Sequence, residues 1–487
     1  MGWKMNKEKK RKMICLEILC FLLIFLLFCY GNKTYEFMYD KNQSEEQLVD
    51  TIKTYVETNF NRIGSSGISV GLVNDKEVMM QNQYGVACAD NEQYVLGSIS
   101  KSFTALGIMQ LVDEGKIDLD NTVGYYLKDD EIYCEEMQLI SVKQLLYHTS
   151  GVGVNDIVLE GKKLKDQGSF QYSNLNYNLL GKIIENVSGL LYSEYMEQNI
   201  FEPLEMNYSV ANLDQADCSG YQSYFGLLVK KENNSFSKRK WIKEPSGYLV
   251  STPNDMNVYL QLYLNDGKVN GKKIISEESI HEIFTFEEDA TNDEVSGGMM
   301  NGKAFYGMGW ICKNAGEEKI YFHSGKVKNF NSMMVLLPKR NYGLVILGNT
   351  GDFLVGTNLF EQMSEGVVQI ILGETVKNIN PLRYIARHLL LDWIMFLITQ
   401  FFVIQLVYIF KFQYGTIVAL SKLFCYLFLC IFFIAIYAYY WGNKKISLVE
   451  ILDFIPDIWY FLNINCFVMG ISCITIVYKL IHNVCRK

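Results

Sequence analysis

The most constraining feature of this sequence is the position of its longest apolar segments, which lie at the two ends of the 487-residue chain. Near the C-terminus, residues 389–410, 417–441 and 458–478 are each predominantly apolar, and short connections separate them. At 1.5 Å per helical residue, each run is long enough to cross the roughly 30 Å of hydrocarbon in a bilayer. Three such runs in succession predict an all-α transmembrane region over residues 381–487.

The N-terminal segment, residues 1–31, begins with six basic side chains, and only Glu17 interrupts the apolar run that follows. This pattern is typical of a secretory signal or of an uncleaved anchor helix. The run is longer than the usual core of a signal and no small-x-small cleavage site follows it, which favours the anchor. Whether the segment is removed stays open.

The same basic cluster predicts the orientation, because loops rich in Lys and Arg remain in the cytoplasm. We therefore expect a multi-pass protein of a bacterial-type cytoplasmic membrane, with the lipid bilayer as a partner and residues 32–380 on the extracytoplasmic side. Arg383 and Arg387, on the outer flank of the first C-terminal run, disagree with this rule, and the denser N-terminal cluster decides.

Four polar residues lie within the C-terminal apolar runs: Asp392, Gln400, Gln405 and Lys422. Such groups are costly in lipid and can mark a polar path across a membrane. The favoured interpretation is structural. Asp392 and Lys422 are near the ends of their runs and can reach the interface, while the two glutamines can hydrogen-bond between helices.

Charge is segregated along the chain. Residues 1–31 carry six basic and two acidic side chains and residues 381–487 carry nine and four, so the net charge of −8 leaves −17 for residues 32–380. A segment this acidic is a poor candidate for nucleic acid, which needs clustered Lys and Arg. Cys88, Cys134, Cys218 and Cys312 within it show no metal-ligand spacing. Neither a metal nor a cofactor is expected, and one disulfide remains possible.

Residues 32–380 show an α+β pattern, with strands at both ends and helices between. The helical spacing of apolar residues predicts helices over 45–60, 102–114, 142–147, 175–187, 255–264 and 353–372. Strand-like runs cover 68–73, 77–81, 306–311, 319–323, 331–337 and 342–347, and Asn74-Asp75-Lys76 indicates a hairpin between the first two. We expect one sheet assembled from both ends of this segment, with a helical region inserted.

The first candidate for chemistry is Gly97-Ser98-Ile99-Ser100-Lys101, directly before an apolar helical run. On a helix, Ser98 and Lys101 are three residues apart and face the same way. A serine hydroxyl needs a nearby base to act as a nucleophile, and a lysine can be that base only if its pKa is lowered. The alternative is a helix cap followed by a surface lysine. Ser-x-x-Lys recurs at 235–238 and 237–240, in a polar run interpreted as a solvated loop.

Two further elements are Tyr172-Ser173-Asn174, which opens a helix, and His323-Ser324-Gly325, which ends a strand-like run. A tyrosine at a loop–helix junction can relay a proton, an asparagine can hold a substrate amide, and a strand glycine allows a backbone to approach closely. The alternatives are a half-buried aromatic with a helix-capping asparagine, and a simple turn at a strand end.

Together these elements resemble the serine β-lactamase and penicillin-binding-protein superfamily, which uses S-x-x-K, then Y-x-N, then K-T-G or H-x-G. The class C branch, with its D-aminopeptidases, D-alanyl-D-alanine carboxypeptidases and esterases, is the most similar. Three more segments support the resemblance, which spans nearly all of residues 32–380: residues 145–151, 246–256 and 306–310. The family fold is an antiparallel sheet with flanking helices and a helical lobe.

The resemblance implies a role for each matching residue. Ser98 would be the acylated nucleophile, Lys101 its activating partner and Tyr172 a second proton-transfer group. Asn174 would bind the substrate amide, and the strand His323, Ser324, Gly325 and Lys326 would line the substrate. The backbone N–H groups of Ser98 and Lys326 would form the oxyanion hole, whereas His148 is expected to shape the fold.

The third motif departs from K-T-G, because His323 replaces the lysine. With an ordinary pKa near 6.5 a histidine is mostly neutral at neutral pH, although Lys326 or Lys328 could compensate. We therefore expect a peptidase or amidase acting on D-amino-acid-containing peptides, of cell-wall or prodrug type. The alternatives are an esterase, a weak β-lactamase or penicillin-binding protein, and a non-catalytic penicillin-binding-like receptor. The C-terminal apolar runs resemble those of membrane-bound prodrug-activating peptidases of the colibactin type. The oligomeric state stays open.

Overall fold

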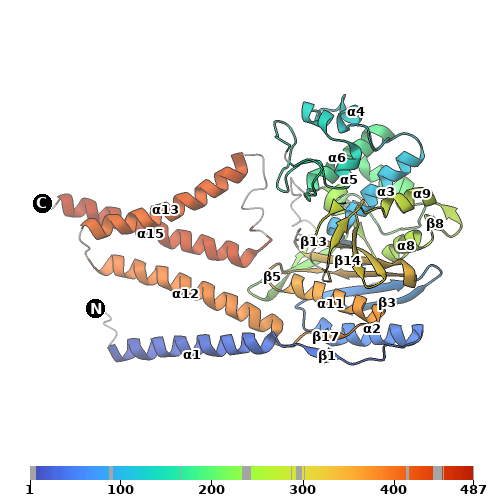
Figure 1. Ribbon diagram of the computed structural model, residues 1–487. Coiled ribbons are helices and arrows are strands. Elements are labelled where there is room, and N and C mark those ends of the chain that lie inside the picture. The colour runs from blue at the N-terminus through green and yellow to red at the C-terminus, as the bar shows by residue number, and fades with distance from the viewer. Residues whose placement is uncertain are drawn as a thin grey trace.

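A computed structural model of the chain shows a sheet domain (residues 32–380) and a group of long apolar helices that extend from one side of it (Figure 1). The structure describes residues 7–86, 92–164, 166–232, 243–286, 288–291, 299–300, 302–412, 416–442, 452 and 454–485. The two repeats of Ser-x-x-Lys at 235–240 and Cys88 lie outside the described residues.

An eight-stranded antiparallel sheet forms the centre of the sheet domain, in the spatial order β10-β11-β12-β13-β14-β15-β2-β3. Strand β15 pairs with β2 from Gly343↔Val73 to Gly348↔Ile68, which joins the C-terminal strands to the N-terminal hairpin. The expectation of one sheet built from both ends of the segment is therefore confirmed. The strands are β2 Gly67–Val73, β3 Val78–Gly85, β10 Glu288–Asp289, β11 Ala304–Tyr306, β12 Ile311–Ala315, β13 Glu318–Val327, β14 Phe330–Leu337 and β15 Tyr342–Gly348.

Helices cover both faces of the sheet, and the alternation of side chains along each strand divides the core into two. On β15, Leu344 and Ile346 pack with helices α2 (Glu45–Phe60) and α11 (Gly356–Leu372). Val345 and Leu347 point to the opposite face and pack with α3 (Ser100–Asp113) and α8 (Pro253–Leu264). A period of two residues along a strand places neighbours on opposite faces, so both faces of this central strand are buried.

A helical lobe lies above the face that α3 covers (Figure 1). It contains α4 Val123–Leu127, α5 Val142–Leu146, α6 Asn174–Ser188 and α7 Tyr192–Met196. Smaller elements complete the sheet domain: β1 Tyr35–Phe37 with β17 Val376–Asn378, β4 Tyr94–Val95 with β7 Val250–Ser251, β5 Ser219–Tyr224 with β6 Leu227–Glu232 and β16 Thr350–Gly351, β8 Lys268–Val269 with β9 Lys272–Lys273, and α9 Glu277–Ile283.

The strand expected over residues 306–311 is wrong, because the chain reverses there. Strands β11 and β12 form a hairpin, and its turn is closed by a hydrogen bond from Gly307 N–H to the Trp310 carbonyl at 2.9 Å. Gly309 has φ +78°, and a Cβ at this position would lie 2.7 Å from Ser102 Cα on α3. Glycine is required both for the left-handed backbone and for this close approach.

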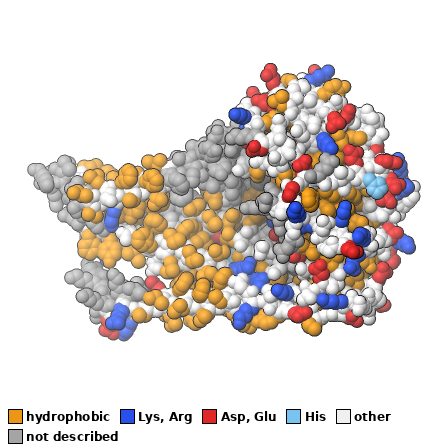
Figure 2. Space-filling model, viewed as in Figure 1, with side chains coloured by type: hydrophobic (Ala, Val, Ile, Leu, Met, Phe, Trp, Pro, Cys, Tyr) orange, Lys and Arg blue, Asp and Glu red, His pale blue; other side chains and the backbone are white. Residues whose placement is uncertain are grey.

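The described residues of the second part form the apolar helices α1 Lys7–Gly31, α12 Arg383–Lys411, α13 Thr416–Gly442 and α15 Pro456–Cys485. By length and composition, α12 and α15 are long and apolar enough to cross a membrane, and shorter apolar stretches are described at Cys15–Gly31 and Ile417–Leu429. Helix α12 packs against α1 and α15, and α13 packs against α15. Hydrophobic side chains dominate their described surface, whereas charged side chains are spread over the sheet domain (Figure 2).

Polar residues of the apolar helices join neighbouring helices. Gln400 donates a hydrogen bond to Glu17 of α1 at 2.8 Å, and Lys422 of α13 donates to Gln405 at 3.0 Å. The expected interhelical role of the two glutamines is confirmed. Asp392 differs from the expectation, because it does not reach outward but lies close to His388 and Asp457.

The cysteines of the sheet domain give no sign of a disulfide in the described part of the chain. Cys134, Cys218 and Cys312 are all buried, and none of them is bonded to another described cysteine. Burial raises the pKa of the Cys134 and Cys312 thiols to about 11 and the pKa of the Cys218 thiol to about 12. These thiols are therefore protonated at neutral pH and pack as small apolar groups.

Candidate active site

Ser98 and Lys101 lie on consecutive turns where the 3₁₀ turn η1 (Gly97–Ile99) leads into α3. Lys101 Nζ is 3.3 Å from Ser98 Oγ, as their spacing of three residues predicts. The Ser98 side chain is half-buried, whereas Lys101 is fully buried. The hydroxyl is therefore open to a substrate, and the amine lies behind it.

The environment of Lys101 favours its neutral form. Burial lowers the pKa of its amine well below the usual 10.5. Its Nζ donates hydrogen bonds of 2.7 Å to Asn174 Oδ1 and 2.7 Å to the Ser246 carbonyl, and both of these oxygens only accept. A neutral amine has two N–H groups, which these acceptors use, so its lone pair faces Ser98 Oγ. This is the arrangement that a general base requires.

The segment Tyr172-Ser173-Asn174 enters the site at the start of α6, and its placement depends on His148. The Ser173 N–H donates to His148 Nδ1 at 3.2 Å, and the two rings of His148 and Tyr172 are 4.5 Å apart between centroids. Lys101 Nζ lies 4.7 Å from the centre of the Tyr172 ring. His148 is fully buried, and burial lowers its pKa well below 6.5. It positions the segment, in agreement with the structural role expected for it.

The carbonyl of Ser246 is a contact that sequence reasoning missed. It belongs to the π-helical turn η6 (Glu244–Tyr248), which is fastened to α3 by a hydrogen bond from Thr104 Oγ1 to the Pro245 carbonyl at 2.7 Å. The sequence marked this segment as part of a motif. A backbone carbonyl, however, leaves no side-chain signal from which its contact with Lys101 could be predicted.

His323 supports the site from beneath. Its ring is fully buried, Nδ1 donates to the Ser324 carbonyl at 2.7 Å, and Nε2 lies 3.4 Å from the Tyr306 hydroxyl, which donates to it. Desolvation, with Lys101 nearby, lowers the pKa of His323 to about 3. The structure therefore differs from the expected substrate contact, because a buried neutral ring offers a substrate neither surface nor charge. Ser324 is also buried.

Gly325 and Gly97 bring the end of β13 against the turn that carries Ser98. A Cβ on Gly325 would lie 1.9 Å from the Leu96 carbonyl, and a Cβ on Gly97 would lie 2.6 Å from Lys326 N. The glycine of the third motif is thus required by the protein's own backbone, not by open space for a substrate. Lys326 N consequently lies beside the Ser98 turn, where an oxyanion hole would need it.

The comparison with protein families gives a match that covers most of the sheet domain. A family model described as Beta-lactamase matches residues 47–358. The chain belongs to the Beta-lactamase family. It is therefore a serine hydrolase of the β-lactamase and penicillin-binding-protein type, with an α+β fold.

Curated relatives of this Beta-lactamase family member include proteins of Staphylococcus aureus and Bacillus subtilis. The chain is 28% identical to Protein flp of Staphylococcus aureus strain MW2 over 371 residues, which are 69% of each chain. It is 30% identical to the putative penicillin-binding protein PbpX of Bacillus subtilis strain 168 over 191 residues, 34% of this chain and 47% of that one.

Solved structures show the same family fold. The octameric penicillin-binding protein homologue from Pyrococcus abyssi has a TM-score of 0.54 and 26% identity, covering 68% of this chain and 78% of its own. The D-alanine carboxypeptidase AmpC from Burkholderia cenocepacia has a TM-score of 0.54 and 17% identity, covering 68% and 99%. A class C β-lactamase in complex with cefoxitin has a TM-score of 0.55 and 17% identity, covering 67% of this chain and 99% of its own.

In this member of the Beta-lactamase family, the side chain of Lys326 is paired with a carboxylate of the protein. Lys326 Nζ lies 2.6 Å from Glu361 Oε1 on α11, and the lysine is one-third exposed. Among the described contacts of the third motif, neither His323 nor Lys326 thus presents an uncompensated positive charge to the site.

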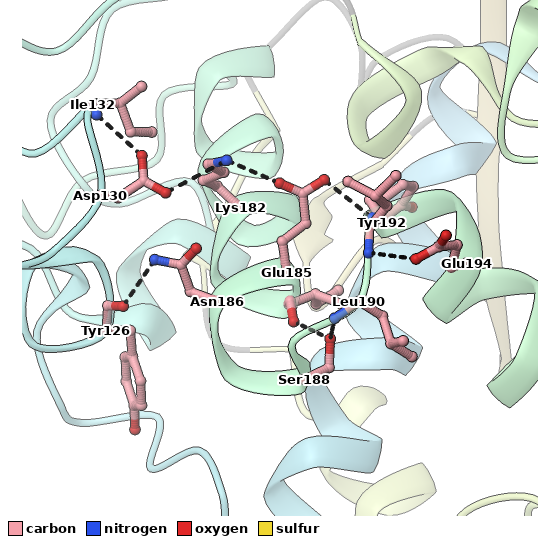
Figure 3. Close-up of polar contacts among 12 residues, drawn as sticks. Tyr126, Asp130, Ile132, Lys182, Glu185, Asn186, Ser188, Leu190, Tyr192 and Glu194 are labelled. Atoms are coloured by element: carbon pink, nitrogen blue, oxygen red, sulfur yellow. Dashed lines mark hydrogen bonds and ion pairs between the residues drawn. The ribbon is translucent and has the colours of Figure 1, made fainter.

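A cavity of about 750 Å³ lies along α6, beside the first turn that carries Asn174. Its wall contains apolar side chains together with Lys182 and Glu185. Lys182 lies between Glu185 (3.1 Å) and Asp130 (3.4 Å), which does not itself line the cavity, as Figure 3 shows. Glu185 also accepts a hydrogen bond from the Tyr192 N–H at 3.0 Å. These contacts fix the far wall. Asn178 Oδ1, one turn beyond Asn174, has no hydrogen-bond partner among the described residues.

Proposed function

We propose that this protein is a membrane-anchored serine hydrolase that acts through an acyl-enzyme on Ser98, as a peptidase or amidase on D-amino-acid-containing peptides. The observation that carries the proposal is the position of Lys101, whose buried amine lies 3.3 Å from Ser98 Oγ. Its two N–H groups are taken by Asn174 and Ser246. The catalytic roles that follow belong to the proposal.

Acylation begins when Ser98 Oγ attacks the carbonyl carbon of the substrate and its proton passes to Lys101 Nζ. The oxyanion that forms accepts hydrogen bonds from the backbone N–H groups of Ser98 and Lys326. Tyr172, whose ring lies beside the Lys101 amine, gives its hydroxyl proton to the leaving nitrogen as the carbon–nitrogen bond breaks and takes the proton from Lys101 in return, so the amine is neutral again. Water then hydrolyses the Ser98 ester through the same base, and this releases the acid and restores the enzyme.

The polar groups of the site favour an open-chain amide over a β-lactam with its carboxylate. The carboxylate of a β-lactam needs a positive charge near the third motif. His323 is neutral there, and Lys326 is paired with Glu361. Asn174 Oδ1 is used by Lys101, so its Nδ2 group is available to donate to a substrate carbonyl.

The membrane part of the proposal rests on the apolar helices. Besides α12 and α15, which are long enough to span, α1 exposes large apolar side chains such as Leu16 and Leu23. Figure 1 shows that α1 begins and α15 ends on the same side of these helices, far from the sheet domain. With the basic N-terminus in the cytoplasm, the sheet domain lies on the extracytoplasmic side and the protein is multi-pass.

The hydrogen bonds of Arg383 and Arg387 account for their position on the outer flank, against the charge rule. Arg383 donates to the Gly31 carbonyl at 3.1 Å and to Gln362 at 2.7 Å, and Arg387 donates to Asn32 Oδ1 at 3.2 Å. Both arginines tie the end of α1 to the sheet domain. A side chain fixed by such contacts is a structural element and a weak signal of orientation.

The proposal is tested by the intact mass of the full-length protein in detergent after exposure to a fluorophosphonate or to a penicillin, with Ser98→Ala beside it. We expect one fluorophosphonate adduct on Ser98 that the variant lacks. Turnover of an N-acyl-D-amino-acid amide, compared with its L-isomer and with an acyl ester, then tests the substrate class. Cleavage of the D-amide at least tenfold faster than of the L-amide is the expected result.

Other outcomes would change the proposal in defined ways. Rapid ester cleavage without amide cleavage would make the protein an esterase, and fast penicillin turnover would make it a β-lactamase. Folded protein that forms no adduct with either reagent would overturn the catalytic proposal and favour a penicillin-binding-like receptor.

A further inference from the structure

A cluster of titratable side chains lies where the apolar helices meet the sheet domain, separate from the contacts of Ser98. His388 and Asp392 are one turn apart on α12, Asp457 begins α15, and Asp352 precedes α11. His388, Asp352 and Asp457 are exposed by only 3%, 3% and 2%. Charged groups buried to this degree need partners, and the proposed hydrolytic cycle uses none of them.

The hydrogen bonds of His388 define which of its nitrogens is free to bind a ligand. Nε2 donates to Asp352 Oδ2 at 2.8 Å, so in the neutral ring Nδ1 carries the lone pair. Nδ1 has no hydrogen-bond partner among the described residues, and Asp457 Oδ2 is 4.0 Å away, beyond hydrogen-bond range. The ring is nine-tenths buried and covered by Tyr384, whose centroid lies 4.7 Å from its own.

Two carboxylates face the same point as this lone pair. His388 Nδ1 and one oxygen each of Asp392 and Asp457 lie within 4.8 Å of one another. Asp392 Oδ1 is likewise buried, with no hydrogen-bond partner in the described part of the chain. Three electron-pair donors that converge without a proton donor between them form the kind of arrangement that a cation completes.

The charge of the cluster also favours a bound cation. Three carboxylates against at most one imidazolium leave a buried net negative charge, which is costly in a low-dielectric interface. A divalent cation would offset it. An imidazole nitrogen with carboxylate oxygens suits zinc or a similar transition metal, whereas calcium and magnesium prefer oxygen alone. The Asp352–His388 hydrogen bond is the outer-shell contact that commonly orients a metal-bound histidine.

We propose that His388 Nδ1, Asp392 and Asp457 bind one divalent transition-metal ion, with zinc as the best chemical match, and that this ion fastens α12 and α15 to the sheet domain. Zinc bonds of about 2.0–2.2 Å hold two ligand atoms up to roughly 4.4 Å apart, so small rotations of the carboxylates close the site.

The residues of the proposed metal site contact the sheet domain at the turn between β5 and β6. Asp457 Oδ1 accepts a hydrogen bond from the Phe225 N–H at 2.8 Å. Gly226 has φ +75°, and a Cβ there would lie 3.2 Å from His388 Cγ, so this turn fits closely against the cluster. An ion held by α12 and α15 would thus fix the position of the turn, and with it the sheet domain, relative to the membrane helices.

The first test is metal content and affinity in the full-length protein in detergent. After removal of metal with a chelator, zinc is added back against a chromophoric competitor, and bound metal is measured by elemental analysis. We expect one zinc per chain. His388→Ala should weaken zinc binding at least 100-fold, whereas Glu46→Gln, which removes an exposed carboxylate on α2, should leave it unchanged.

Because His388→Ala also removes packing, Asp392→Asn and Asp352→Asn provide tests that preserve side-chain volume. Asp392→Asn replaces a ligand, and Asp352→Asn only removes the group that orients His388, with an expected loss of about 10- to 100-fold in affinity. Cobalt added in place of zinc should give visible absorption bands that change in both variants.

A defined result would overturn the proposal. Protein that is labelled normally at Ser98, and is therefore folded, but binds neither zinc nor cobalt in stoichiometric amount has no metal site here. A protonated His388 shared among the carboxylates would then explain the cluster. Zinc binding that survives the Asp392→Asn, Asp457→Asn double substitution would place the metal elsewhere and overturn the assignment equally.

Discussion

The amine of Lys101 and the hydroxyl of Ser98 lie 3.3 Å apart, yet only the serine side chain reaches the surface. The same amine is held by Asn174 Oδ1 and by the Ser246 carbonyl, from two elements far apart in the sequence. Burial lowers the pKa of the amine well below 10.5 and the two acceptors fix its direction, which is the arrangement that the proposed role as a base requires.

Replacing the base by a permanently charged side chain should stop acylation. We expect Lys101→Arg to lower the rate of fluorophosphonate incorporation at Ser98 by at least about 100-fold, because a guanidinium group stays protonated in proteins. Intact mass against time measures this rate. Lys116→Arg, on an exposed lysine beyond α3, is the matched control and should react like the wild type. Equal rates in Lys101→Arg and wild type would show that another group takes the proton.

A carboxylate beside Lys101 should move the pH dependence of acylation. In the wild type the rate falls as pH drops through the Lys101 pKa, which burial holds well below 10.5. Asn174→Asp places a negative charge where Oδ1 now lies, 2.7 Å from Nζ, and so stabilises the ammonium form and raises this pKa. The acid limb of the pH–rate profile should shift to higher pH, with slow labelling at pH 7 and recovery in alkali.

The control for this shift is Asn178→Asp, one turn further along α6 and without a contact to Lys101 among the described residues. It should move the acid limb much less. An unchanged limb in Asn174→Asp would mean that Lys101 does not set the profile.

Much of the fold could be predicted because its elements follow simple periods. Apolar residues of helical spacing gave the bounds of α2, and the Asn74 turn gave the β2–β3 hairpin. The reversal at Gly309 was not predicted, because the apolar run around it looks like one continuous strand and only packing against α3 shows the need for a left-handed glycine.

The contacts of the candidate site also divide into those that the local sequence predicts and those that it does not. Ser98 and Lys101 are three residues apart, so local geometry alone predicts their contact. The Ser246 carbonyl, the burial of His323 and the Glu361 partner of Lys326 depend on contacts between distant segments, and no local pattern encodes them. The cluster at His388 was hidden for the same reason, since Asp352 and Asp457 are far in the sequence from His388 and Asp392.

Release of Lys326 should improve the reaction with negatively charged acyl donors. Glu361→Gln removes the partner 2.6 Å from Lys326 Nζ, and a partly exposed ion pair of this kind is worth about 1 kcal/mol, or roughly fivefold. We expect penicillin to label Ser98 about 3- to 10-fold faster, with fluorophosphonate labelling unchanged. The gain should shrink at high salt.

The double variant Glu361→Gln, Lys326→Met tests whether the freed charge causes this gain. It keeps the backbone N–H of residue 326 and should return penicillin labelling to the wild-type rate. A gain that persists in the double variant would assign the effect to a structural change in α11.

Acid stability should depend on His323, because its folded pKa is about 3 and an unfolded histidine titrates near 6.5. Between these values the unfolded chain binds a proton that the folded chain does not, so stability is lost as pH falls below 6.5. The loss in the free energy of unfolding is about 2 kcal/mol by pH 5.

The variant His323→Gln tests this dependence. It keeps an acceptor for Tyr306 and a donor for the Ser324 carbonyl without titrating. We expect its thermal midpoint to fall by about 3 °C less than that of the wild type between pH 7.5 and 5.0. His148 titrates in both proteins and cancels in this comparison. Equal losses would show that His323 is protonated in the folded protein, contrary to its burial.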